Sequence, residues 1–138
     1  MSERGGNVIR EVSFEIQGQP VPKARPRVTR LKNGLSRTFT PKATEAYAEL
    51  VAWSYRKEVG EGIQLEGDLY FKGVFHREGK RRADFDNLAK AVTDALNGIA
   101  YQDDAQIVSA EVWVLYGAKQ PRAKVTLREL EDPEDQDD

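Results

Sequence analysis

One apolar stripe with helical spacing does more than any other feature to limit how this chain can fold. The spacing predicts an α-helix from about residue 86 to residue 97, which Gly98 then ends. At about 100° per residue, Asp86, Lys90 and Asp94 fall on the side opposite the stripe. The helix must therefore pack one face on another element and leave a charged face uncovered. The stripe consists of Leu88, Ala91, Val92, Ala95, Leu96 and Ile99.

The other regular elements follow from alternation and capping. Apolar and polar residues alternate in four segments, which predicts strands at residues 11–17, 68–76, 106–116 and 123–130. A second helix begins at Thr40-Pro41, a favoured N-cap and first helical residue, and ends near Gly60. We expect residues 117–121 to join the last two strands as a hairpin. The predicted fold class is α/β (α+β), a two-layer sandwich of two helices on a four-stranded mixed sheet, in the order β-α-β-α-β-β. The third strand is expected to place on one face Val108, Ala110, Val112, Val114 and Tyr116.

Length and composition predict one domain and exclude several classes of site. The 138 residues suit one domain at 8–130 with a basic arm at 20–40, between a disordered N-terminus at 1–7 and an acidic, disordered tail at 131–138. No apolar run approaches the roughly 18 residues of a membrane span. With no cysteine and one histidine, the chain lacks the residues for disulfides or thiolate metal sites. Any metal would therefore be held by carboxylates. No G-x-x-x-x-G-K-[ST] motif indicates a nucleotide cofactor.

The charges are unevenly distributed along the chain. Seven of the 23 acids lie in residues 129–138 and all 21 cations precede them, so residues 1–128 carry about +5. Residues 20–44 contain cations and no acid, and the Asn33-Gly34 turn signal within them predicts an exposed hairpin. Such a block suits a polyanion such as DNA, although a solvated basic loop is the alternative. The predicted DNA-binding residues are Lys23, Arg25, Arg27, Arg30, Lys32, Arg37, Arg81 and Arg82.

Acidic residues flank the motif helix at both ends. Asp84 and Asp86 precede or begin the helix, with Phe85 expected to turn inward, and Asp103-Asp104 follows it. Carboxylates that converge would repel one another unless a hard divalent cation such as Mg²⁺ or Mn²⁺ neutralised them. The sequence does not show that the two ends converge. Alternatively, one of the first two acids caps the helix and the second pair is an acidic turn. Asp94 can pair with Lys90 or reach a metal.

Two motifs then point to a family. The segment "DFDNLAKAVTDALNGIAYQDDAQI" resembles the signature of RusA-type Holliday junction resolvases, and so do "GQPVPKARPRV" and "TFTPKATEAY" upstream. The resemblance covers roughly residues 14–113. It implies that Asp84, Asp86 and Asp104 are metal-binding, catalytic carboxylates and that Lys90 is an essential lysine. Asn87 and Asp103 are possible supporting residues beside these ligands.

These observations predict a Mg²⁺-dependent endodeoxyribonuclease, with Mn²⁺ as a substitute, that resolves four-way DNA junctions in recombination and repair. The resemblance implies 5′-phosphate products and a cytoplasmic protein of bacterial or phage origin. A near-symmetric substrate and the family both predict a homodimer. Trp53 and Trp113 are expected in the core or in the dimer interface. The alternatives are a non-catalytic nucleic-acid-binding protein and a flap or single-strand nuclease on the same scaffold.

Overall fold

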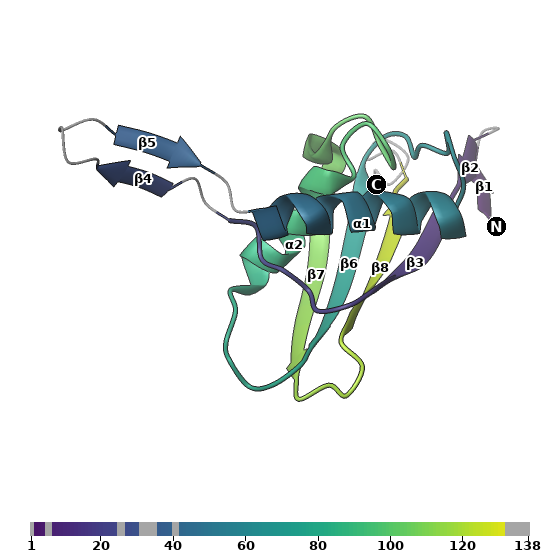
Figure 1. The fold of residues 1–138 in the computed structure, drawn as a ribbon. Helices are drawn as coiled ribbons and strands as arrows, with labels where there is room; N and C mark the ends of the chain where they lie inside the picture. The colour runs from purple at the N-terminus through teal and green to yellow at the C-terminus, as the bar shows by residue number, and fades with distance from the viewer. Residues whose placement is uncertain (1, 5–6, 25–26, 31–35, 40–41, 132–138) are drawn as a thin grey trace.

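The computed structural model describes residues 2–4, 7–24, 27–30, 36–39 and 42–131 (Figure 1). Arg25, Lys32 and most of the expected acidic tail therefore lie outside the described residues. No helix in this described part has the length and apolar character needed to cross a membrane. The elements are β1 (Ser2–Arg4), β2 (Asn7–Ile9), β3 (Glu11–Gln17), β4 (Arg27–Arg30), β5 (Ser36–Phe39), α1 (Lys42–Glu58), β6 (Leu69–Arg77), α2 (Phe85–Ala95), the 3₁₀ turn η1 (Asp104–Gln106), β7 (Ile107–Tyr116) and β8 (Arg122–Glu129).

Four strands form the central sheet in the order β3-β8-β6-β7. β8 is antiparallel to both β3 and β6, whereas β6 and β7 are parallel. Because parallel neighbours need a crossover connection, α2 carries the chain back across the sheet between them. The sheet is therefore mixed, as the sequence predicts. The order β-α-β-α-β-β of its helices and strands is also confirmed.

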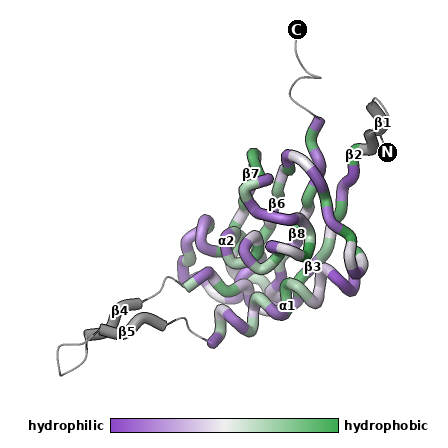
Figure 2. The backbone as a smooth tube through the Cα atoms, turned by 90° about the horizontal axis from the view of Figure 1, so that it is seen from above, coloured by the Kyte–Doolittle hydropathy of each residue, from purple (hydrophilic) through white to green (hydrophobic). Residues whose placement is uncertain are grey.

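Both helices cover the same face of the sheet (Figure 1). The predicted stripe of α2 is buried at Leu88, Ala91, Val92 and Leu96, and α1 contributes Tyr47, Val51 and Tyr55 to the same core. The sheet contributes the inward-facing residues of β3, β6 and β8, such as Phe14, Phe75 and Leu127. Figure 2 shows hydrophobic and hydrophilic stretches interspersed through the sandwich, and along these strands buried residues alternate with more exposed ones. This alternation puts the apolar half under the helices and leaves the other face of the sheet uncovered.

The prediction of a hairpin between the last two strands is wrong. β8 does not pair with β7 but enters the sheet between β3 and β6. The loop at residues 117–121 crosses the end of β6, where Ala118 N–H donates to the Arg77 carbonyl at 2.9 Å. The physical reason lies in the pattern of β8, whose alternate residues Ala123, Val125 and Leu127 are fully buried and suit a central strand. β7, with exposed residues, is left at the edge.

The expected face of β7 also needs a correction. The register between β6 and β7 shifts after Leu69, which pairs with Ile107, whereas Tyr70 pairs with Ser109. Val108 is the extra residue and is 59% exposed. A bulge moves one residue out of alternation, so Ile107 packs on the core in place of Val108.

Trp53 and Trp113 are both more than half exposed, which excludes the core for each of them.

Two small hairpins lie outside the central sheet. β1 pairs with β2, although the sequence analysis expected residues 1–7 to be disordered. β4 pairs with β5, which confirms the hairpin expected within the basic arm. In Figure 1 this hairpin stands away from the sandwich, beside the first turn of α1.

Candidate functional site on helix α2

The N-terminal end of α2 carries the first predicted carboxylates. Asp84 occupies the N-cap position, but its side chain makes no capping hydrogen bond. Its Oδ2 instead accepts a hydrogen bond from Asn87 Nδ2 at 3.3 Å, and Asp86 Oδ1 accepts one from the Asn87 backbone N–H at 2.9 Å. Asn87 thus contacts both acids, one through its backbone and one through its side chain. Both carboxylates are exposed. We refer to Asp84, Asp86 and Asn87 as the N-terminal acidic group.

Phe85 does not turn inward and is 61% exposed. The expectation assumed an extended chain in which alternate side chains point to opposite sides. The helix already begins at Phe85, so that alternation ends at Asp84. Asp84 and Asp86 are therefore adjacent because of the first helical turn and the Asn87 contacts, with an apolar ring exposed between them.

The third predicted carboxylate, Asp104, lies at the other end of the helix. Its backbone N–H donates to Asn97 Oδ1 at 2.8 Å, and its carboxyl shares a hydrogen bond with the Asp94 carboxyl. Burial, followed by that hydrogen bond, raises the pKa of Asp104 above its ordinary value. Asp94, Asn97 and Asp104 form what we call the C-terminal acidic group.

A cation already lies against this C-terminal acidic group. Lys23 Nζ is 3.3 Å from Asp94 Oδ2, and the Lys23 backbone N–H donates to the Asn87 carbonyl at 2.8 Å. Asp94 therefore pairs with Lys23, from the proline-rich segment, and not with Lys90, which was one of the two alternatives that the sequence left open for Asp94. The ammonium of Lys23, which the sequence assigns to DNA, is engaged with a carboxylate. Lys90 is exposed on the helix between the two groups.

The two acidic groups do not converge. Eight residues of helix, at 1.5 Å rise each, put the Cα atoms of Asp86 and Asp94 about 12 Å apart. In the described part of the chain, no three Asp, Glu or His side chains are close enough together to hold one metal ion. The crossover topology explains this separation, because α2 runs from the end of β6 to the start of β7. The turn after α2 can bring Asp104 back only to the later turns of the helix.

Asp103 and Asp104 have different environments. Asp103 Oδ1 accepts a hydrogen bond from the Ala105 N–H at 2.8 Å, and Gln106 Oε1 accepts one from the Asp103 N–H at 3.1 Å. This reciprocal arrangement is a capping box, which stabilises the turn. The side chain of Asp103 thus has a structural role, whereas that of Asp104 faces another carboxyl group.

Sequence reasoning did not identify Asn97 or Tyr101, and it left Asp94 undecided. Tyr101 is fully buried and its hydroxyl donates to the Thr93 carbonyl at 2.6 Å, which holds the turn against α2. The available signal was Asp94 itself, a charged residue on the uncovered face of α2, one turn beyond Lys90. The contact with Lys23 spans 71 residues of sequence, and local spacing does not reveal it.

An acidic helix on a two-layer sandwich, reached by two basic segments, is an arrangement suited to hydrolysis of nucleic acid at a metal. The family model for the endodeoxyribonuclease RusA matches residues 17–128. The chain belongs to the RusA endodeoxyribonuclease family. A protein of Bacillus subtilis (strain 168), named "Uncharacterized protein YqaN", is 30% identical over 139 residues, which cover 86% of this chain and 96% of the relative.

Proposed function

We propose that this protein is a Mg²⁺-dependent endodeoxyribonuclease that resolves four-way DNA junctions, leaving 5′-phosphate ends. One observation carries the proposal: in a chain of the RusA family, α2 presents acids at both ends of its uncovered face. Asp84 makes no capping hydrogen bond, and burial raises the pKa of Asp104, so a stabilising role in the fold explains neither of these two carboxylates. Carboxylates in such positions are suited to bind a metal cation, which in turn can bind a phosphodiester.

The donor set fits a hard divalent ion. Carboxylate oxygens are the ligands that Mg²⁺ and Mn²⁺ prefer, and Asp94 already pairs with the ammonium of Lys23. The proposed ligands are Asp84, Asp86 and Asp104. Mg²⁺–oxygen bonds are about 2.1 Å long, so one ion cannot contact both acidic groups as they lie. Two ions, one at each group, suit this arrangement, provided that the ion at the C-terminal acidic group displaces the ammonium of Lys23. When bound, the metal would activate water and stabilise charge on the departing oxygen.

The residues of α2 have distinct proposed roles around the scissile phosphate. Lys90, exposed between the two groups, would attract the phosphate and stabilise the charge that develops on it. Asn87 would orient Asp84 and Asp86 through its two hydrogen bonds. Asn97 would fix Asp104 through the backbone N–H that it binds. Asp103 would act indirectly, through the turn that it caps.

A homodimer follows from the symmetry of the substrate, because two strands related by a near two-fold axis must both be cut. The edge strand β7 supports this proposal, since it exposes Val108, Trp113 and Leu115. Exposed apolar side chains on one strand suit burial against a second copy of the chain. Sedimentation of the wild type against Trp113→Glu tests this: we expect the variant to be monomeric, and an unchanged mass would exclude this strand from the interface.

The decisive experiment for the function uses a synthetic four-way junction, a flap and a linear duplex of matched sequence. We expect paired cuts in the junction with Mg²⁺ and none with EDTA. Binding without cleavage under all metal conditions would favour the non-catalytic DNA-binding alternative. Faster cleavage of the flap than of the junction would favour a flap or single-strand nuclease.

A further inference from the structure

We propose that the end of the sheet beside Asp84 is a second DNA-backbone surface, which holds a different duplex arm of the junction from the one bound by the basic hairpin. This inference rests on the proposed function and names how a branched substrate is recognised. We call the surface the basic end. It comprises Lys80, Arg81, Arg82, Lys119, Arg122 and Lys124.

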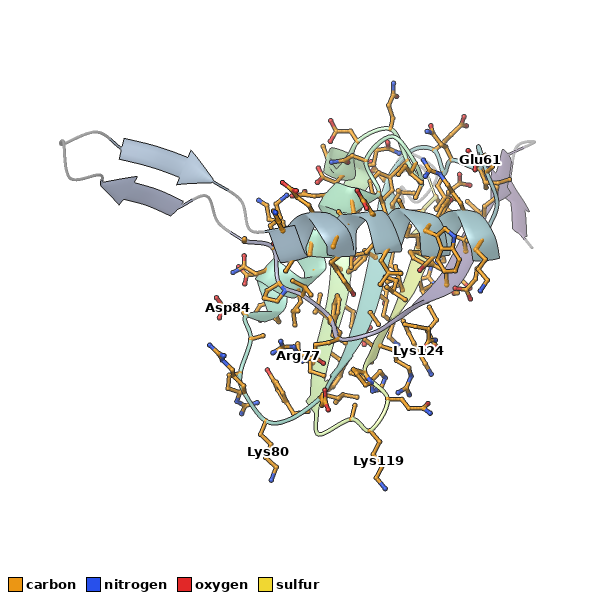
Figure 3. The ribbon with its side chains drawn as sticks, viewed as in Figure 1. Glu61, Arg77, Lys80, Asp84, Lys119 and Lys124 are labelled. Atoms are coloured by element: carbon orange, nitrogen blue, oxygen red, sulfur yellow. The ribbon has the colours of Figure 1, made fainter. Side chains whose placement is uncertain are left out.

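The topology of the sheet assembles this surface. β6 and β7 are parallel, so they end at the same edge, and β8 begins there. The β6–α2 loop, residues 78–84, and the β7–β8 loop, residues 117–121, therefore meet. Gly117 N–H donates to the Gly79 carbonyl at 2.7 Å, which joins the two loops directly. In Figure 3, Lys80 and Lys119 both point away from the sheet at this end, while Asp84 lies at its margin.

The charge of the basic end is strongly positive. Five of its six cations are exposed, namely Lys80, Arg81, Arg82, Lys119 and Lys124. The acids near them are Glu78 and Asp84, in the first loop, and Glu15, whose carboxylate is 4.0 Å from Arg122. Burial first, and then the charges of Arg122 and Lys124, lowers the pKa of His76, which places these cations around one strand end. A cluster of this kind matches the phosphates of a duplex.

The β6–α2 loop is held in place, which favours a defined contact with a ligand. The Arg82 guanidinium lies 4.8 Å from the centroid of the Tyr116 ring, a cation–π contact. The Tyr116 hydroxyl accepts a hydrogen bond from the Ala83 N–H at 3.3 Å, and Arg77 Nη1 donates to the Arg81 carbonyl at 3.2 Å. A loop already fixed loses less conformational entropy when it binds a phosphate.

The basic end and the hairpin are connected to α2 in different ways. The root of the hairpin is anchored where Lys23 binds the Asn87 carbonyl and where Ala24 N–H donates to Thr44 Oγ1 at 3.3 Å. The basic end instead continues directly into Asp84 at the start of the helix. The acids of α2 therefore lie between two basic segments. A linear duplex at the cleavage point needs to contact only one of these two basic surfaces. A branched DNA has a second duplex arm, which can contact the other surface.

The test removes three cations from the basic end without touching the proposed catalytic residues. The variant Lys80→Ala/Lys119→Ala/Lys124→Ala is compared with Arg56→Ala/Lys57→Ala/Lys72→Ala, which removes the same charge from α1 and mid-sheet. Fluorescence anisotropy in EDTA measures the affinity for a four-way junction and for a linear duplex at several salt concentrations. Because no metal is present, the result does not depend on whether the protein cleaves DNA.

We expect the basic-end variant to lose about tenfold more affinity for the junction than for the duplex, and the control to lose little of either. The log–log salt slope for the junction should fall by roughly 0.9 for each phosphate that the variant no longer neutralises. Equal losses on both substrates, or the same losses in the control, would overturn the proposal. So would equal affinities of the wild-type protein for the two substrates. If the triple variant melts early, Lys119→Glu alone must show the same selective loss.

Discussion

The two acidic groups of α2 contain similar residues but are built in different ways. The N-terminal group lies within four consecutive residues, is exposed, and is organised by Asn87. The C-terminal group joins the helix to a turn and to Lys23, and it is partly buried. The first group is open to ligands from solvent, whereas the second is already neutralised by a cation from within the chain. The comparison suggests that a metal binds directly at one end of α2 and displaces an ammonium at the other.

Removing a proposed metal ligand tests whether both groups serve the same reaction, and we expect the largest effect here. Asp84→Asn, Asp86→Asn and Asp104→Asn should each lower junction cleavage about 100-fold or more, since a bound metal is worth several kcal/mol of transition-state stabilisation. DNA binding should persist or improve because a negative charge facing the phosphates is lost. Single-turnover cleavage and anisotropy measure the two effects. Near-normal cleavage by Asp104→Asn would confine the catalytic site to the N-terminal group.

Replacing the two asparagines compares how each group is held. Asn97→Ala removes the side chain that binds the Asp104 backbone, and Asn87→Ala removes one hydrogen bond to Asp84. We expect about a tenfold loss of cleavage for Asn97→Ala, as for other residues that orient metal ligands, and a smaller loss for Asn87→Ala. The reason is that local helix geometry still holds the N-terminal group. A larger defect in Asn87→Ala would reverse this ranking.

Lys23→Met tests the neutralising cation. Without the ammonium, Asp94 and Asp104 should bind Mn²⁺ about two- to fivefold more tightly, the change expected for a partly exposed ion pair. Calorimetric titration of Mn²⁺ measures this, and it also counts the ions bound. Lys57→Met, which removes a cation that lies over Trp53, is the matched control. Unchanged Mn²⁺ affinity in Lys23→Met would show that Lys23 and the metal do not compete.

The smallest expected effect concerns stability and pH. The raised pKa of Asp104 means that the folded protein holds this proton more tightly than the unfolded chain does. Stability is therefore lost as pH rises from the ordinary carboxyl value through the raised one. Asp104→Asn avoids this loss, so its Tm should exceed that of the wild type at neutral pH, by less than about 3 °C, and the gap should close in acid.

Replacing Asp103, the residue next to Asp104, should have the opposite effect on stability. Asp103→Ala removes a capping side chain and should destabilise the protein by about 1 kcal/mol at neutral pH. Thermal melts in EDTA between pH 4 and pH 8 compare the two variants with the wild type. A lower Tm for Asp104→Asn at pH 7 would mean that this carboxylate stabilises the fold.

The sequence predicted the parts of the fold that depend on local periodicity. The stripe on α2 needed only its 3.6-residue period, and the four strands of the central sheet needed only alternation. The position of β8 could not be predicted in the same way, because a short loop before it is compatible with a hairpin and with a strand that crosses β6. Its fully buried alternate residues were a sign of a central strand, but not of which neighbours it would have.

In the candidate site, too, the sequence predicted local features but not contacts between distant residues. Asp84 and Asp86 can be recognised together because they are two residues apart, and family motifs identify Asp104. The contacts of Asp94 with Asp104 and Lys23 depend on the turn after α2 and on the path of the proline-rich segment. Neither the turn nor the path of that segment can be predicted from residue spacing. The exposure of Phe85 was missed because the helix begins one residue earlier than expected.

The central place of β8 has a consequence for folding during synthesis. β8 supplies every hydrogen-bonded neighbour of β3 and one of the two neighbours of β6. Until residues 122–129 leave the ribosome, β3 has no partner in the central sheet and the apolar faces of α1 and α2 lack much of their support. The nascent chain must therefore wait for almost its whole length before the sheet can close, and non-local pairings of this kind slow folding. A nascent chain that has emerged only as far as residue 121 would expose an open, aggregation-prone β6–α2–β7 unit, to which a chaperone could bind.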